Sequence, residues 1–125
     1  MDDAGDVPVE SIEKYNIKIV PVNVMFGTEE YLSGIDITRQ SFYEKVKEVG
    51  DHNFPKTSQP NPYQFTEVYK SILAEGEKDI LTVTVSEKLS KTYASAEIAA
   101  QELESQGNFY LFDSQGGSAA QGFMA

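Results

Sequence analysis

The sequence predicts an α/β domain, a three-layer arrangement in which helices cover both faces of a parallel sheet. Short β-branched runs alternate with amphipathic segments of roughly 10 to 20 residues, which is the pattern of βαβ units. The chain has 125 residues, 40% of them hydrophobic, which is enough for one core. We therefore expect residues 1–125 to form a single domain.

The first half of the chain should contain two helices and a broken strand. Residues 8–15 begin with a proline, whose fixed φ suits a first helical turn. Residues 17–26 are rich in β-branched side chains, and Pro21 favours an edge position or a break into two pieces because proline lacks a ladder donor. A turn and a short returning strand should follow. Thr38 is then the expected N-cap of an amphipathic helix that ends at Gly50.

The second half of the chain supplies the clearest βαβ pattern. A helix should begin at residue 61 or 62 and end at Gly76, and residues 79–85 should form a buried strand. Another helix is expected within residues 89–107, and another strand at residues 108–114. No strand precedes the first helix, and residues 116–125 end on an apolar segment without a polar cap. We therefore expect a first strand to be missing and the chain to be a piece of a larger protein.

Composition narrows the classes of function. Acidic residues outnumber basic ones by 20 to 10, giving a net charge of −10, and the basic residues are scattered, so nucleic acid is not an expected partner. The absence of cysteine excludes disulfides, thiolate zinc sites and cysteine nucleophiles, and it suits a cytoplasmic protein. The acidic N-terminus is unlike a signal peptide, and no apolar run approaches the roughly 20 residues of a transmembrane helix.

Catalytic and metal sites find little support in the residues present. His52 is the only histidine, and its polar neighbourhood favours a solvated loop residue over a catalytic base. A serine triad would need this histidine, and no G-x-S-x-G turn is present. The cluster of Asp2, Asp3 and Asp6 lacks the spacing of a calcium loop, and no glycine-rich phosphate loop occurs. We therefore expect no metal and no cofactor.

Polar turns occur where a parallel sheet usually binds ligands. Residues 2–6, 86–92 and 113–117 should lie at the carboxyl edge of the sheet, where helix N-termini present free N–H groups. The turn TSQP, residues 57–60, also leads into a helix, so its hydroxyl groups would suit the same anion site. Serine, threonine and aspartate are also the usual helix caps, and this plainer interpretation stays open.

Longer motifs run through nearly the whole chain in a fixed order. They are D-D-x-x-D-V-P at 2–8, E-x-Y-x-I-x-x-V-P at 13–21, Y-x-x-G-x-D-I at 31–37, T-S-Q-P-x-P at 57–62, S-x-x-L-S-x-T-Y-x-S-A at 86–96 and D-S at 113–114. In this order and spacing they resemble the N-terminal domain of the DegV family of bacterial fatty-acid-binding proteins. The chain departs from the family pattern at Lys91, which stands where the family has glycine, and at Met1 and Asp3, which replace threonine and serine.

The resemblance implies a function and a site. Members of the family hold a long-chain fatty acid in a tunnel, and in many bacteria they present its carboxylate to a separate fatty acid kinase subunit for phospholipid synthesis. Carried over to this sequence, Thr57 and Ser90 are the hydroxyl donors to the carboxylate, with Ser58 and Thr92 as neighbouring second choices. The resemblance thus implies a lipid-binding protein that is not an enzyme. Because members of the family also have a second domain that covers the acyl chain, it implies as well that this second domain is missing here.

Two other functions stay open from the sequence alone. Ser90 would be the nucleophile of a small hydrolase or transferase, although no base is evident beside it. Alternatively, the domain binds no small ligand and pairs with a second copy through apolar surface that a missing domain leaves uncovered.

Overall fold

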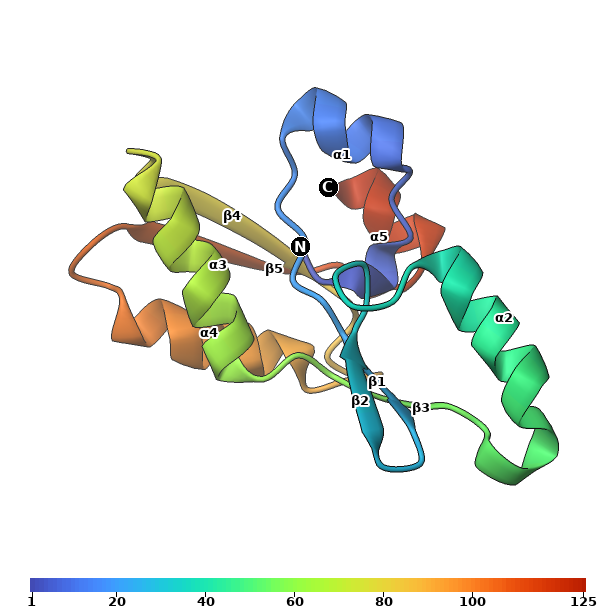
Figure 1. Ribbon diagram of the computed structural model, residues 1–125. Helices are drawn as coiled ribbons and strands as arrows, with labels where there is room; N and C mark the ends of the chain where they lie inside the picture. The colour runs from blue at the N-terminus through green and yellow to red at the C-terminus, as the bar shows by residue number, and fades with distance from the viewer.

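The strands form two separate sheets in the computed structural model (Figure 1). One is a three-stranded antiparallel sheet in the order β2-β1-β3, and the other is a two-stranded parallel sheet of β4 and β5. The structure describes the backbone of residues 1–125 and every side chain except those of residues 51 and 52. The expectation for His52 therefore lies outside the described side chains.

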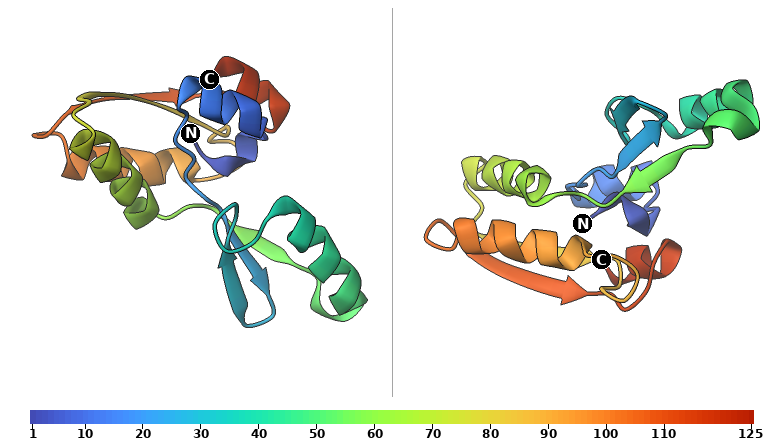
Figure 2. Two further views of the ribbon diagram at one scale, coloured as in Figure 1. Left: turned by 45° about the horizontal axis from the view of Figure 1, so that its top comes forward. Right: turned by 90° about the horizontal axis from the view of Figure 1, so that it is seen from below.

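The parallel sheet and two helices make up what we call the parallel region. It consists of β4 (Asp79–Thr84), β5 (Asn108–Asp113), α3 (Pro62–Ala74) and α4 (Thr92–Glu102). α3 and α4 lie side by side on one face of the sheet (Figure 2). Their shared core contains Val20, Phe65, Tyr69, Ile80, Ala96, Ala99, Ala100 and Leu103. The predicted α/β class with parallel strand pairing is therefore confirmed.

The opposite face of the parallel sheet is more open. Side chains alternate between the faces of a strand, so Leu81 and its register partner Tyr110 point away from α3 and α4. These two side chains are 63% and 57% exposed, and Phe112 on the same face is also exposed. Of the two helix layers that the sequence predicts, the one on the α3–α4 side is present, whereas this second face carries exposed apolar side chains.

The antiparallel sheet and one helix make up what we call the antiparallel region. It consists of β1 (Asn23–Phe26), β2 (Glu29–Leu32), β3 (Lys56–Ser58) and α2 (Arg39–Val49). Gly27, with φ of 62°, makes the tight turn of the β1–β2 hairpin, and this confirms the predicted returning strand. A small second core forms here from Val24, Phe26 and Ile37, with Val22, Tyr31, Phe42, Val46 and Val49 packed against it.

Two strand predictions have different outcomes. The break predicted at Pro21 is confirmed, because the β1 ladder begins only at Asn23 while Val20 makes a separate bridge to Asp2. The prediction that residues 57 and 58 belong to a turn is wrong. Both lie in β3, with Thr57 opposite Val24 of β1. A strand whose partner is distant along the chain leaves no local signal, and only the turn residues that follow it were recognisable.

The helix starts predicted at Thr38 and at residue 61 or 62 agree with the structure, whereas α4 begins only at Thr92, after the first residues of the predicted range 89–107. Thr38 and Asn61 each begin a helix with a capping box, in which side chain and backbone groups bond reciprocally. The other helical elements are η1 (Asp3–Gly5), α1 (Val9–Tyr15), η2 (Gly50–Asn53) and α5 (Ala119–Met124). Within the described residues, every helix is too short or too polar to cross a membrane.

The first residues pair with the segment that leads into β1. The Met1 amino group donates to the Lys18 carbonyl (2.8 Å), Val20 N–H donates to the Met1 carbonyl (2.8 Å), and Asp3 N–H donates to the Val20 carbonyl (3.0 Å). A groove of about 320 Å³ continues from this pairing along the free edge of β4. Burial lowers the pKa of the Met1 amino group to about 6, an effect that the nearby Asp2 charge only partly opposes.

Candidate functional site

Four residues with hydroxyl side chains line one open cavity of about 610 Å³ between the two regions. Thr57 and Ser58 come from β3, whereas Ser90 and Thr92 come from the end of the β4–α4 loop and the start of α4. The remaining lining residues are Asp2, Ala4, Val22, Gln59, Val85 and Leu89. Hydroxyl donors beside apolar side chains are the arrangement needed for a ligand with a polar head and an apolar body.

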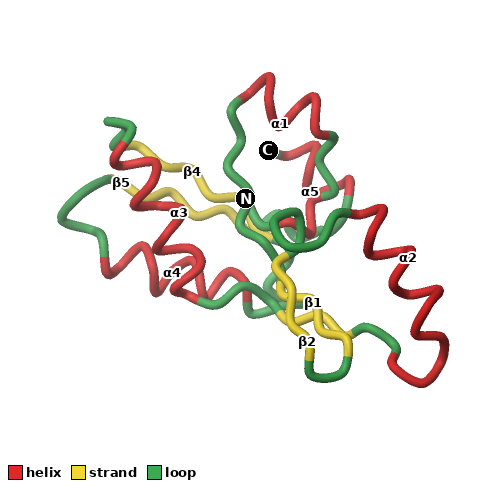
Figure 3. The backbone as a smooth tube through the Cα atoms, in the orientation of Figure 1, coloured by secondary structure: helices red, strands yellow, loops and turns green.

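Polar turns meet at the carboxyl edge of the parallel sheet, as the sequence predicted. Val85 N–H donates to an Asp2 carboxylate oxygen (2.8 Å), and Ser86 N–H donates to the Gly116 carbonyl (2.8 Å). Loop segments fill this junction between the two sheets (Figure 3). The carboxyl edge therefore joins parts of the chain that are far apart in sequence.

The β3 side of the cavity is fixed by Asn23, a buried residue of β1. Its Nδ2 lies 3.2 Å from the Ser58 hydroxyl and 3.5 Å from the Gln59 carbonyl, to both of which it donates. Its Oδ1 accepts from Nε2 of Gln64 in α3 (3.1 Å). Because these groups are partly shielded from water, leaving any of them without a partner is costly. Asn23 thus attaches the Ser58–Gln59 segment to β1 and links it to the first turn of α3.

The Ser90 side of the cavity is a tight turn that leads directly into α4. Leu89 N–H and Ser90 N–H both donate to the Ser86 carbonyl (2.9 and 3.1 Å). The Ser90 and Thr92 hydroxyls lie 2.9 Å apart, and Thr92 is buried while Ser90 is partly exposed. The two hydroxyls form a connected pair at the cavity wall.

Gln59 connects the two sides, and the sequence prediction did not assign it to the site. Its Oε1 accepts from the Ser90 hydroxyl (3.2 Å) and from Lys91 N–H (3.0 Å). Gln59 stands inside the TSQP motif, so its position was recognisable, but its partners were not, because they belong to another loop. This is the only described hydrogen bond set that joins the Thr57 segment directly to the Ser90 turn.

Asp2 contributes a buried carboxylate to the cavity wall. It is 1% exposed and accepts from Ala4 N–H (3.0 Å), Val85 N–H (2.8 Å) and Gln121 Nε2 (3.1 Å). All three donors are neutral, and no described lysine or arginine forms an ion pair with it. The sequence placed Asp2 at this edge, and the structure adds that it anchors the N-terminal turn to β4 and α5.

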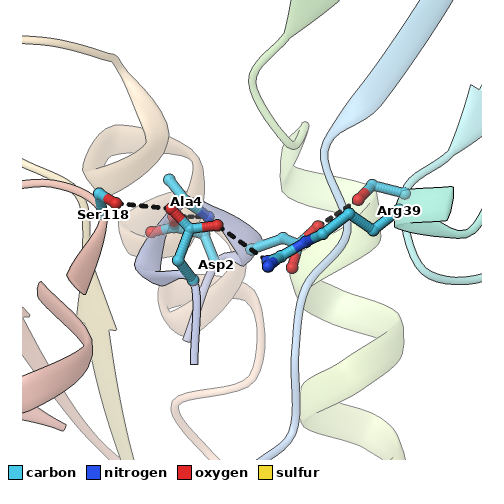
Figure 4. A network of polar contacts seen from close by, with 7 residues as sticks. Asp2, Ala4, Arg39 and Ser118 are labelled. Carbon is cyan, nitrogen blue, oxygen red and sulfur yellow. Dashed lines mark hydrogen bonds and ion pairs between the residues drawn. The ribbon is translucent and has the colours of Figure 1, made fainter. Parts of the chain in front are cut away.

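Asp6, an exposed acidic residue, also anchors the N-terminal turn that carries Asp2. Asp6 accepts from Arg39 of α2 (3.1 Å) and from the Ser118 hydroxyl next to α5 (2.6 Å). Figure 4 shows Ser118 and Arg39 approaching from opposite sides, with Asp2 and Ala4 between them. The turn that carries Asp2 is therefore fastened to α2 and to the segment that leads into α5.

Lys91 fits its position without backbone strain. Its φ of −85° and ψ of 19° are accessible to any L-residue, so glycine is not required here. Its N–H makes the bond to Gln59, and its side chain is exposed. The departure from the family glycine thus leaves the geometry of the turn intact.

Other kinds of site are less well supported. Among the described residues, no group of three or more His, Cys, Asp or Glu side chains is placed to hold a metal ion. The described side-chain partners of Ser90 are Gln59 and Thr92, and neither is a base that would activate a nucleophile. Ser90 therefore has the surroundings of a hydrogen-bond donor.

Comparisons with known proteins agree on one family. The family model that matches residues 1–125 describes the DegV family, whose members are called uncharacterised. A DegV domain-containing protein of Clostridium perfringens is 36% identical over 123 residues, and the match covers 98% of this chain and 43% of that protein.

Solved structures give the same result. DegV of Bacillus subtilis, described as a fatty acid binding protein, matches with a TM-score of 0.86 and 32% identity, over 99% of this chain and 43% of that one. A stearic acid-binding protein of Eubacterium ventriosum matches with a TM-score of 0.85 and 31% identity, over 98% of this chain and 43% of that one. This chain therefore spans less than half the length of the relatives that it matches.

Proposed function

The chain belongs to the DegV family, and on that premise we propose that it binds the carboxylate of a long-chain fatty acid through the hydroxyls of Thr57 and Ser90. One observation carries the proposal: the two hydroxyl-bearing segments converge on a single cavity. Ser58 and Thr92 line the same cavity and are the proposed secondary donors. The similar structures from Bacillus subtilis and Eubacterium ventriosum, both described as binding fatty acids, support the choice of ligand.

The chemistry of the cavity suits a carboxylate that must later leave. Hydrogen bonds from hydroxyl groups to a carboxylate are charge-assisted, so they are stronger than bonds between neutral groups. The hydroxyl donors carry no charge, and the buried carboxylate of Asp2 would repel a second carboxylate placed close to it. Binding through neutral donors therefore orients the head group without an ion pair that would slow its release. Leu89, Val22 and Val85 offer apolar contact for the first part of the acyl chain.

We further infer that the protein is a carrier and not an enzyme, and that it presents the bound fatty acid to a fatty acid kinase in the cytoplasm. This step rests on the family resemblance. Because the chain covers 43% of its relatives, residues 1–125 are proposed to be the N-terminal domain of a two-domain protein. The rest of such a protein would cover the acyl chain.

The exposed face of the parallel sheet favours a second candidate function. Leu81, Tyr110 and Phe112 form an apolar group on β4 and β5 that suits contact with another protein surface. In this alternative the chain binds no lipid and forms a homodimer through that face. A serine hydrolase is less favoured, because Ser90 has no base among its described partners.

Native mass spectrometry of the purified chain, followed by titration with stearic acid, tests the main proposal. We expect a 1:1 complex in the wild type, about tenfold weaker binding in Thr57→Ala and in Ser90→Ala, and no detectable complex in the double variant. Thr28→Ala and Ser105→Ala, at exposed hydroxyls outside the cavity, are the matched controls. Equal affinity in the wild type and the double variant would refute the head-group assignment, and an empty dimer would favour the second function.

A further inference from the structure

The Gln59 carboxamide has a defined orientation because one of its partners is a backbone N–H. An N–H group can only donate, so the atom that faces Lys91 N–H at 3.0 Å must be the acceptor, Oε1. The same oxygen lies 3.2 Å from the Ser90 hydroxyl. Gln59 Oε1 therefore accepts two hydrogen bonds from consecutive residues of the Ser90 turn.

This orientation of the Gln59 carboxamide determines where the hydroxyl hydrogens of Ser90 and Thr92 point. Ser90 has one hydroxyl hydrogen and two close partners, Gln59 Oε1 and Thr92 Oγ1, the latter at 2.9 Å. Because Gln59 Oε1 can only accept, Ser90 donates to it, and Thr92 then donates to Ser90. The Ser90 hydrogen is thus directed toward the Thr57 segment.

The backbone of Gln59 is itself held firmly. Its carbonyl accepts from Asn23 (3.5 Å), and the next residue, Pro60, is buried and has a fixed φ. A side chain that extends from a fixed backbone loses less conformational freedom when it bonds across a gap. The contact to the Ser90 turn is thus a short connection between two ordered segments.

We propose that Gln59 is a positioning residue that sets the separation of the Thr57 segment and the Ser90 turn before the ligand arrives. This inference rests on the proposed function, because it assigns Gln59 a role in binding the same carboxylate. The carboxylate takes the Ser90 hydrogen from Gln59, while Gln59 keeps its bond to Lys91 N–H and so keeps the turn in place. Without Gln59 the Ser90 turn would be less ordered before binding, so the free-energy cost of ordering it would be subtracted from the binding free energy.

The test compares three variants by amide hydrogen exchange, read by NMR, and by titration with stearic acid. Gln59→Met keeps the length of the side chain but removes the acceptor. Gln59→Glu keeps the acceptor oxygens but adds a negative charge at the cavity wall. Gln40→Met is the matched control, because Gln40 is also exposed and its side chain also makes a hydrogen bond, to Glu44.

We expect Gln59→Met to speed exchange of the Lys91 amide about fivefold, as for the loss of one net hydrogen bond, and to weaken stearic acid binding by a similar factor. Gln59→Glu should keep the slow exchange but bind at least tenfold more weakly, because its charge repels the head group. In a Ser90→Ala background, Gln59→Met should change the affinity less than twofold, since it acts through Ser90.

The outcomes separate this inference from the proposed function. Unchanged Lys91 exchange in Gln59→Met would overturn the positioning role, as would faster exchange with unchanged affinity. Additive losses in the Gln59→Met, Ser90→Ala double variant would also overturn it, because Gln59 would then act independently of Ser90. A wild-type chain that binds no stearic acid would instead refute the proposed function, and the exchange data would still decide whether Gln59 orders the turn.

Discussion

The parallel region is held together by the larger apolar core, whereas the antiparallel region has a hairpin ladder and a smaller core of Val24, Phe26 and Ile37. α4 buries Ala96 and Ala99 completely, and α3 buries Phe65 completely. By contrast, α2 has no buried residue. Local stability follows buried contacts, so we expect the antiparallel region to open more readily. The candidate site lies between the two regions. Ser90 lies next to the region that we expect to be more stable, and Thr57 lies in the region that we expect to open more readily.

The most direct test of this difference in packing is to replace one phenylalanine in a helix of each region. Phe65→Ala should lower the free energy of unfolding by about 4 kcal/mol, because it leaves a cavity in the main core. Phe42→Ala in α2 should cost about half as much, since Phe42 is only partly buried against Phe26. Urea denaturation measures both. Equal losses would show that the antiparallel region is as tightly packed as the parallel one.

The buried Met1 amino group, which pairs with the segment leading into β1, makes the stability of the folded chain depend on pH. Its pKa is about 6 in the folded chain and 8.0 in its ordinary state, so between these values the unfolded chain binds more protons. The free energy of unfolding should therefore rise with pH through this window, by up to roughly 3 kcal/mol.

Acetylation of the N-terminus provides the control for this pH dependence. An acetylated chain should lose most of the increase between pH 6 and 8, because it has no amino group to titrate. Any contribution of His52 to the pH dependence of stability would be present in both the free and the acetylated chain, so it cancels when the two pH profiles are subtracted. Identical pH profiles for the two forms would contradict the assignment to Met1.

Asn23 links the two regions, and replacing it should lower the free energy of unfolding by less than Phe65→Ala does. Asn23→Ala removes the bond to Gln64 of α3 and the two bonds that hold the Ser58–Gln59 turn. We expect a loss of roughly 1 to 2 kcal/mol, with faster hydrogen exchange at Thr57 and Ser58. Asn108→Ala, which removes an exposed bond to Asp79, is the control. If only the control variant loosened β3, the linking role would be wrong.

Local chemistry explains which parts of the fold could be predicted from the sequence. The capping residues Thr38 and Asn61 mark helix starts by bonds within one turn, so a single sequence displays them. The β-branched run at β4 and the aromatic run at β5 are equally local signals. β3 escaped prediction because what makes it a strand is its ladder with β1, and the residue opposite Thr57 is Val24.

The candidate site shows the same limit. The resemblance to a known family identified Thr57 and Ser90, and the structure places both at one cavity. Gln59 was visible in the motif, but its bond to Lys91 depends on how two distant loops approach. Asp2 was predicted at the sheet edge from its sequence position, whereas its bond to Val85 required the three-dimensional structure.

The smallest effect we expect comes from a partly exposed cation of the antiparallel region, Lys45. Lys45 pairs with Glu29 (2.7 Å), contacts the Tyr31 hydroxyl (2.8 Å) and lies over the Tyr31 ring (4.9 Å to its centroid). Lys45→Met keeps the apolar stem over the ring but removes the charge, so it should lower Tm less than any variant above. The difference from wild type should shrink at high salt, because the pair is screened. Lys70→Met, which breaks a looser 3.6 Å pair with Glu67 on α3, is the control. If Lys45→Met lowered Tm more than Phe42→Ala, this ion pair and not the aromatic packing would be the main support of the antiparallel region.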